Sequence, residues 1–295
     1  MNTQQLAETV AGKDQLMGSL LLFTASVEWW LNLVTHSSHL GRLGIFTVTW
    51  ILLWLPVAVP IAIKLKWRPF APVAAAQKLP LLAPLYLVAP IGLWGFLIAD
   101  RHHWSDYGLT WLPNISLLWG WGLAVLSLGL VFGYEIWQGW IIWHSENQSK
   151  LLVNALPILL LAMWIGVSEE VIFRGFLQIE LAAEYGFWLG GVIASLIFAL
   201  LHLLWERQQT WPQVPGLWLM GMVLTLTLST HQNLWLAIGL HTGWVWGLTC
   251  LDAAGMITYQ TTAPGWFVGK YQQPLAGAAG IIALVATGIA LQAIL

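Results

Sequence analysis

The sequence predicts an all-α fold, namely a polytopic transmembrane helix bundle of eight or nine spans. Three observations predict it. Only 8% of the 295 residues are charged, against roughly 25% in an ordinary soluble domain. Hydrophobic residues make up 58% of the chain, and its mean hydropathy is +0.73. The chain also contains 22 tryptophans, which are common where membrane helices meet lipid headgroups.

This composition excludes several classes of protein. So few charges could not cover the surface of a soluble protein of this size, so a soluble enzyme, a disordered chain and a nucleic-acid binder are excluded. The lipid bilayer is the expected partner instead. The single cysteine, Cys250, excludes an internal disulfide and a cysteine-rich metal site. The first 16 residues lack a basic segment followed by an apolar one, so we expect no cleaved signal peptide.

The first half of the chain indicates four spans, because crossing a bilayer takes about 20 mostly apolar residues. These candidate spans cover 17–35, 43–63, 79–99 and 115–134. Prolines lie within or at the ends of the second and third, where they are tolerable if neighbouring helices bind the freed carbonyls.

The loop between the second and third spans predicts the orientation of the chain. Four of the eleven basic residues lie in it: Lys64, Lys66, Arg68 and Lys78. The positive-inside rule therefore places this loop in the cytoplasm. The N-terminus, two spans earlier, is then cytoplasmic as well.

The fifth candidate span, 152–182, contains three charged residues directly after an apolar run. They are Glu169, Glu170 and Arg174. An ionisable group inside a span is costly and is a functional-site hypothesis by default. On a helix Glu170 and Arg174 are i,i+4 neighbours, whereas Glu169 points about 100° away. One carboxylate is then neutralised and the other is left for general-base chemistry. The alternative is a buried ion-pair network that fixes helix packing.

The sixth candidate span, 187–204, contains His202 near its end, with Phe198 one turn before it. A histidine in such a place is more often a core or interfacial residue than a functional one. The turn EYGFW at 184–188 is almost equidistant from Glu169 and His202. A tight helical hairpin at this turn would return the two side chains to similar depth.

The last three candidate spans cover 214–230, 234–251 and 275–294. His241 lies seven or eight residues into the second of them, on the order of 10 Å deep at 1.5 Å per residue. At that depth His241 is a candidate functional residue. The alternative to a functional role is a histidine that only makes a hydrogen bond to a carbonyl of a neighbouring helix. The segments GFWLG at 186–190 and GWVWG at 243–247 fit the GxxxG pattern of close helix packing.

Together these motifs resemble the family of CAAX proteases and bacteriocin-processing proteins, also called the ABI family of glutamic or metallo intramembrane endopeptidases. That family carries EExxxR, then FxxxH, then a histidine followed four residues later by Asn or Asp. The matching residues here are Glu169, Glu170 and Arg174, then Phe198 and His202, then His241. The sequence contains no motif of the zincin, rhomboid or presenilin type.

The resemblance covers about residues 150–250 and implies three parts. They are N-terminal transmembrane helices over 1–150, a catalytic core over 151–252, and a C-terminal loop with the final transmembrane helix over 253–295. One position departs from the family pattern, because Val245 stands where the family has Asn or Asp. If that residue holds an oxyanion, another donor is needed here, for example Thr242 or the indole of Trp244.

The resemblance also implies an activity, which is hydrolysis of peptide bonds in membrane-associated protein or peptide substrates. Glu169 would be the general base, oriented with His202 toward the attacking water, and His241 would stabilise the oxyanion. Glu170 and Arg174 would form the supporting ion pair. The set Glu169, His202 and His241 would equally suit a catalytic zinc ion, so zinc as a cofactor stays open.

Two other functions stay open from the sequence. One is a non-catalytic immunity or scaffold member of the same family, which Val245 favours. The other is a transporter that uses the Glu, Arg and His side chains as a proton-coupled site. A transporter predicts inverted repeats, and no repeat stands out in the sequence.

Overall fold

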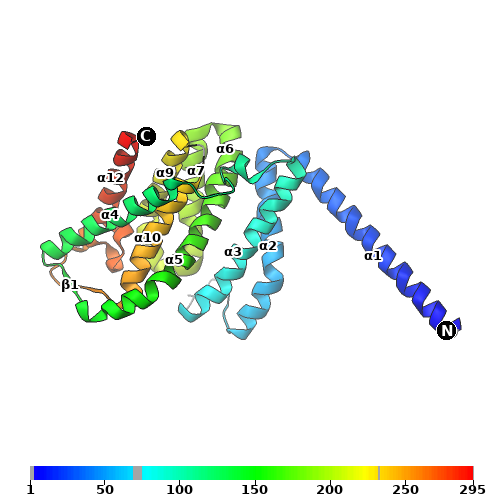
Figure 1. Ribbon diagram of the computed structural model, residues 1–295, viewed down its shortest axis with the longest axis horizontal. Coiled ribbons are helices and arrows are strands. Elements are labelled where there is room, and N and C mark those ends of the chain that lie inside the picture. Colours follow the sequence, from blue (N-terminus) through cyan, green and yellow to red (C-terminus); the bar gives the residue numbers. More distant parts are fainter. Residues whose placement is uncertain (1–2, 69–74, 232, 295) are drawn as a thin grey trace.

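The computed structural model describes residues 3–68, 75–231 and 233–294, and they form a helical bundle with one two-stranded sheet (Figure 1). The helices are α1 (Thr3–Thr35), α2 (His39–Lys64), α3 (Ala75–Asp100), α4 (Ile115–Trp137), α5 (Gln148–Glu170), α6 (Gln178–Tyr185), α7 (Phe187–Leu201), α8 (Leu203–Thr210), α9 (Val214–His231), α10 (Trp235–Ala254), α11 (Gly265–Val268) and α12 (Ala278–Ile294). A π-helical segment, η3 (Val171–Leu177), joins α5 to α6. Short 3₁₀ turns are η1 (Trp104–Tyr107), η2 (Ser145–Asn147), η4 (Trp211–Gln213), η5 (Lys270–Gln272) and η6 (Pro274–Ala276). The strands β1 (Ile141–Trp143) and β2 (Ile257–Tyr259) pair antiparallel.

The predicted spans are helical, so the all-α fold class is confirmed. Among the described residues, four helical stretches are long and apolar enough to cross a membrane: His39–Lys64, Leu79–Asp100, Ile115–Trp137 and Ser145–Tyr185. The apolar helices over 187–201 and 278–293 are shorter. The chain is therefore a multi-pass membrane protein, but a count of eight or nine spans is not confirmed. The orientation of the N-terminus stays a prediction.

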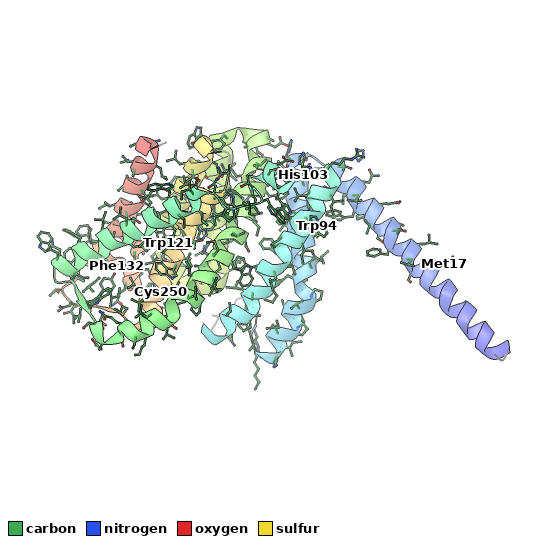
Figure 2. All side chains as sticks on the ribbon, viewed as in Figure 1. Met17, Trp94, His103, Trp121, Phe132 and Cys250 are labelled. Atoms are coloured by element: carbon green, nitrogen blue, oxygen red, sulfur yellow. The ribbon has the colours of Figure 1, made fainter. Side chains whose placement is uncertain are left out.

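The N-terminal helices extend from one side of the bundle (Figure 1). Helix α1, which carries the labelled Met17, projects away from the remaining helices (Figure 2). The Met17 side chain is 62% exposed. Helices α2 and α3 pack side by side. The indoles of Trp50 and Trp54 on α2 donate to the carbonyls of Leu85 and Leu81 on the proline-containing α3. Neighbouring side chains thus bind backbone groups of a helix that prolines weaken.

Helix α10 lies at the centre of the bundle, against α4, α5 and α9. Its contact with α4 is a contact between backbones. A Cβ atom on Gly239 would lie 2.1 Å from the carbonyl oxygen of Leu117, and one on Gly243 would lie 2.6 Å from Ala124 Cβ. The close packing that the pattern at 243–247 indicated is therefore confirmed. In the pattern at 186–190, Gly190 packs closely on α6, whereas Gly186 has φ of +82° and makes the turn.

Gly239→Ala is expected to lower the free energy of unfolding by about 1–3 kcal/mol, as overpacking does. The added methyl group would collide with backbone atoms of α4, which cannot rotate away as a side chain can. Denaturant titration in detergent micelles measures the loss. Gly122→Ala is the matched control, since a Cβ atom there meets nothing within 4 Å. Equal stability of the two variants would contradict the packing described here.

The predicted helix over 152–182 departs from a regular α-helix at one place. Helices α5 and α6 form one 41-residue helical stretch with η3 between them, from Ser145 to Tyr185. In η3 the hydrogen bonds run from residue i to i+5, a feature frequent at functional sites. The chain then reverses at Gly186 into α7. The tight helical hairpin predicted at 184–188 is therefore confirmed.

Candidate active site

The two adjacent glutamates lie at the last residues of α5, and Arg174 lies one turn on in η3. All three side chains are buried, with exposed fractions of 5%, 0% and 1% in chain order. Arg174 Nη1 donates to Glu170 Oε1 at 3.1 Å. The predicted i,i+4 ion pair is thus present. Since a buried charge is stable only when paired, Glu170 and Arg174 depend on each other.

His241 reaches the same carboxylates from α10 and is only 2% exposed. Its Nδ1 lies 2.6 Å from Glu170 Oε1. Its Nε2 lies 3.5 Å from Glu169 Oε2. An ionised carboxylate only accepts hydrogen bonds, so Nδ1 carries a proton and donates to Glu170. Glu170 thereby orients the imidazole and turns Nε2 toward Glu169, which is how a carboxylate orients a catalytic histidine.

The charges at the site nearly balance. Glu169 and Glu170 contribute two negative charges and Arg174 one positive charge, and His241 contributes a second positive charge when both ring nitrogens are protonated. In a water-excluded interior such charges interact far more strongly than in water. The side chain of Arg174 also lies over the ring of Phe198, 4.7 Å from its centroid, and that contact adds to its stabilisation.

The two oxygens of Glu169 have different surroundings. Oε1 accepts a hydrogen bond from the hydroxyl of Tyr86, which comes from α3. Oε2 is buried and has no hydrogen-bond partner within the part of the chain that the structure describes. Its nearest charged partner is His241 Nε2, at a separation that is too long for a direct hydrogen bond. The two groups therefore face each other without a direct hydrogen bond, and a water that bonded to both would lie to one side of the line between them.

His202 lies beside this cluster and does not contact it directly. Its Nδ1 donates to the carbonyl of Phe198 at 2.8 Å. The centroid of the Phe198 ring lies 4.6 Å from the centroid of the His202 ring and 6.1 Å from that of the His241 ring. The structure therefore joins Glu169, Glu170, Arg174 and His241, and it places Phe198 between them and His202.

The residues around Val245 do not replace the expected polar side chain. The indole of Trp244 donates to Ser127 of α4 at 3.0 Å, so the expectation that it supplies a donor to the site is wrong. The hydroxyl of Thr242 faces the sulfur of Met163 on α5. Helix α10 packs against α4 on one side and α5 on another. The Trp244 indole contacts α4 and the Thr242 hydroxyl contacts α5.

The zinc alternative can be compared with the geometry. Within the described residues, no group of three or more His, Cys, Asp or Glu side chains could hold a metal ion. His241 uses Nδ1 on Glu170, and His202 turns Nδ1 to a backbone carbonyl. The set Glu169, His202 and His241 does not converge on one point in this arrangement.

Sequence reasoning missed one residue of this site, Tyr86. A tyrosine among prolines and leucines in a span is typical of an interfacial aromatic residue. No residue near Tyr86 in the sequence indicates that its hydroxyl makes a hydrogen bond, and its partner Glu169 is 83 residues away in the chain. Only the packing of α3 on α5 brings the two together.

Comparison with known proteins places Glu169, Glu170, Arg174, His202 and His241 in a matched region, which does not include Tyr86. Residues 151–247 match the family model described as type II CAAX prenyl endopeptidase Rce1-like. A Bacillus subtilis (strain 168) protein named "Putative membrane peptidase YdiL" is 25% identical over 135 residues, which are 43% of this chain and 53% of that protein. The chain thus matches about half the length of this curated relative. No solved structure matches.

Proposed function

We propose, from a chain whose residues 151–247 match the Rce1-like family model, that this protein is an intramembrane endopeptidase of the CAAX-protease type. Its substrates would be membrane-associated proteins or peptides. The observation that carries the proposal is the facing pair Glu169 Oε2 and His241 Nε2, buried at a separation of 3.5 Å. A carboxylate and an imidazole so placed suit the activation of a water molecule.

In the proposed reaction Glu169 is the general base. It takes a proton from a water bound at its Oε2 and beside His241 Nε2, and the resulting hydroxide attacks the scissile carbonyl. His241, doubly protonated, donates from Nε2 to the oxyanion that forms. Protonated Glu169 then gives its proton to the leaving amine. Protons and charges balance over the cycle, because Glu169 is again an ionised carboxylate once the peptide bond has broken.

The other residues support these two. Glu170 orients His241 through Nδ1 and is neutralised by Arg174. Phe198 separates the cluster from His202 and covers one face of Arg174. We assign His202, on the other side of the Phe198 ring, a role toward the substrate rather than toward the water. The division into N-terminal helices 1–150, a catalytic core 151–252 and a C-terminal part 253–295 belongs to this proposal.

A comparison of membrane-protein termini tests the proposal. Cells carrying the wild-type protein or Glu169→Gln, at equal expression, are examined by mass spectrometry of new N- and C-termini. Termini present only with the wild type would establish a protease and name its substrate.

Matched termini in the two strains would contradict the proposal. They would favour a non-catalytic immunity or scaffold role, to which Val245 points, because the expected polar partner of His241 is missing. A proton-coupled transporter would also leave the termini matched, and proteoliposome uptake assays then separate it from a scaffold.

A further inference from the structure

We infer that Tyr86, on α3 and outside the family-matched segment, is a positioning residue for Glu169. The inference rests on the proposed function, because it concerns how the general base of that reaction is held. It implies that residues 151–247 contain only part of the active site, and that the N-terminal helices complete it.

The geometry around Tyr86 is specific. Its hydroxyl donates to Glu169 Oε1, while Oε2 of the same carboxylate faces His241. A phenol that binds one oxygen fixes the rotation of the carboxylate about its terminal torsion, which is otherwise broad. The ring of Tyr86 also packs edge-on against Trp164 of α5, with centroids 6.1 Å apart. Ring and hydroxyl therefore both contact the helix that carries Glu169.

The helix that carries Tyr86 is itself held in place. Trp50 of α2 donates to the carbonyl of Leu85, the residue before Tyr86, at 2.8 Å. At the C-terminal end of α3, Asp100 accepts a hydrogen bond from the guanidinium of Arg42 on α2.

Helix α2 is in turn fixed to the core. Arg42 Nε lies 3.1 Å from a carboxylate oxygen of Glu180 on α6, and His39 Nδ1 lies 2.7 Å from the other. Glu180 is buried. Since α6 continues from α5 through η3, these ion pairs connect the N-terminal helices to the same helical stretch as Glu169. This connection sets the position of α3, and so of the Tyr86 hydroxyl.

The consequence is a divided role for the two carboxylate oxygens. Oε1 already accepts the hydrogen bond of the phenol and is the weaker base for it, so proton abstraction falls to Oε2, which faces His241. Without the hydroxyl the carboxylate can rotate, and either oxygen can turn away from the water. The reaction would then lose alignment, whereas substrate binding would not change.

Tyr86→Phe tests this, because phenylalanine keeps the ring against Trp164 and removes only the hydroxyl. The protein in lipid nanodiscs is assayed with a quenched fluorescent peptide that ends in a farnesylated CAAX sequence. We expect kcat to fall by about tenfold to a hundredfold, with KM unchanged within about twofold.

Tyr259→Phe is the matched control. The hydroxyl of Tyr259 donates to another buried carboxylate, Glu135, at 3.2 Å, beside the two-stranded sheet. Burial and the Glu135 carboxylate raise the pKa of Tyr259, so this hydroxyl stays protonated as a donor. The control removes the same chemical group from a tyrosine–glutamate pair that the reaction does not use, and kcat should not change.

A spectroscopic measurement separates this inference from the proposed function. The carboxylate stretching band of Glu169 is identified as the infrared band that Glu169→Gln removes, and Tyr86→Phe is expected to shift it. An unshifted band, an unchanged kcat, or a rise in KM alone would overturn the inference. If the wild type cleaves no peptide while the band shifts, the proposed function fails and the bond between Tyr86 and Glu169 stands.

Discussion

Glu169→Gln is expected to lower the rate of peptide cleavage at least about a thousandfold, the scale of general-base loss combined with a misplaced water. Glutamine keeps the shape of the side chain and can still accept the Tyr86 hydrogen bond through its amide oxygen. It cannot take a proton from water. Single-turnover cleavage in nanodiscs measures the effect.

The same variant should remain folded, because Glu169 Oε2 has no hydrogen bond to lose among the described residues and the ion pair of Glu170 and Arg174 is kept. Glu184→Gln is the matched control, since it changes an exposed glutamate on α6 to the same amide. Retained cleavage in Glu169→Gln, or equal loss in both variants, would rule out Glu169 as the base.

Arg174→Met is expected to lower the free energy of unfolding by about 3–5 kcal/mol, the cost of breaking a buried ion pair from one side. Methionine has a similar length and no charge, so Glu170 would be left buried with His241 as its one positive partner. The cation–π contact with Phe198 would be lost as well. SDS titration in mixed micelles measures the change in stability.

The double variant Glu170→Gln with Arg174→Met removes both charges of the pair and should recover a large part of this loss, because Glu170 is no longer a buried carboxylate without its arginine. Lys150→Met, an exposed cation at the start of α5, should change stability by less than about 0.5 kcal/mol. A double variant that is less stable than Arg174→Met would show that charge burial is not the cause.

The sequence predicts more of this site than of the protein around it. The ion pair of Glu170 and Arg174 follows from helical spacing alone, and the hairpin at Gly186 follows from one glycine between two apolar helices. The convergence of Glu169 and His241 rests on the three motifs taken together. These features are local, or repeat along one helix, so a pattern of residues is enough to indicate them.

Other features depend on contacts between distant helices, which no local pattern encodes. The bond from Tyr86 to Glu169 requires α3 to pack on α5, and the ion pairs of Glu180 require α2 to pack on α6. The number of spans also depends on packing. His241 lies in a helix of 20 residues that is largely buried by its neighbours, so hydropathy alone says little about how it crosses the bilayer.

The π-helical segment η3 has a consequence for how this helix can change in length. A bond from i to i+5 closes a turn that contains one residue more than a bond from i to i+4. If one residue within Val171–Leu177 is deleted, the remaining residues can form ordinary α-helical turns. The hairpin after them then keeps its direction. The same deletion in α5 would rotate everything after it by about 100°. A deletion between Glu170 and Arg174 would also move the arginine from the i+4 to the i+3 position relative to Glu170.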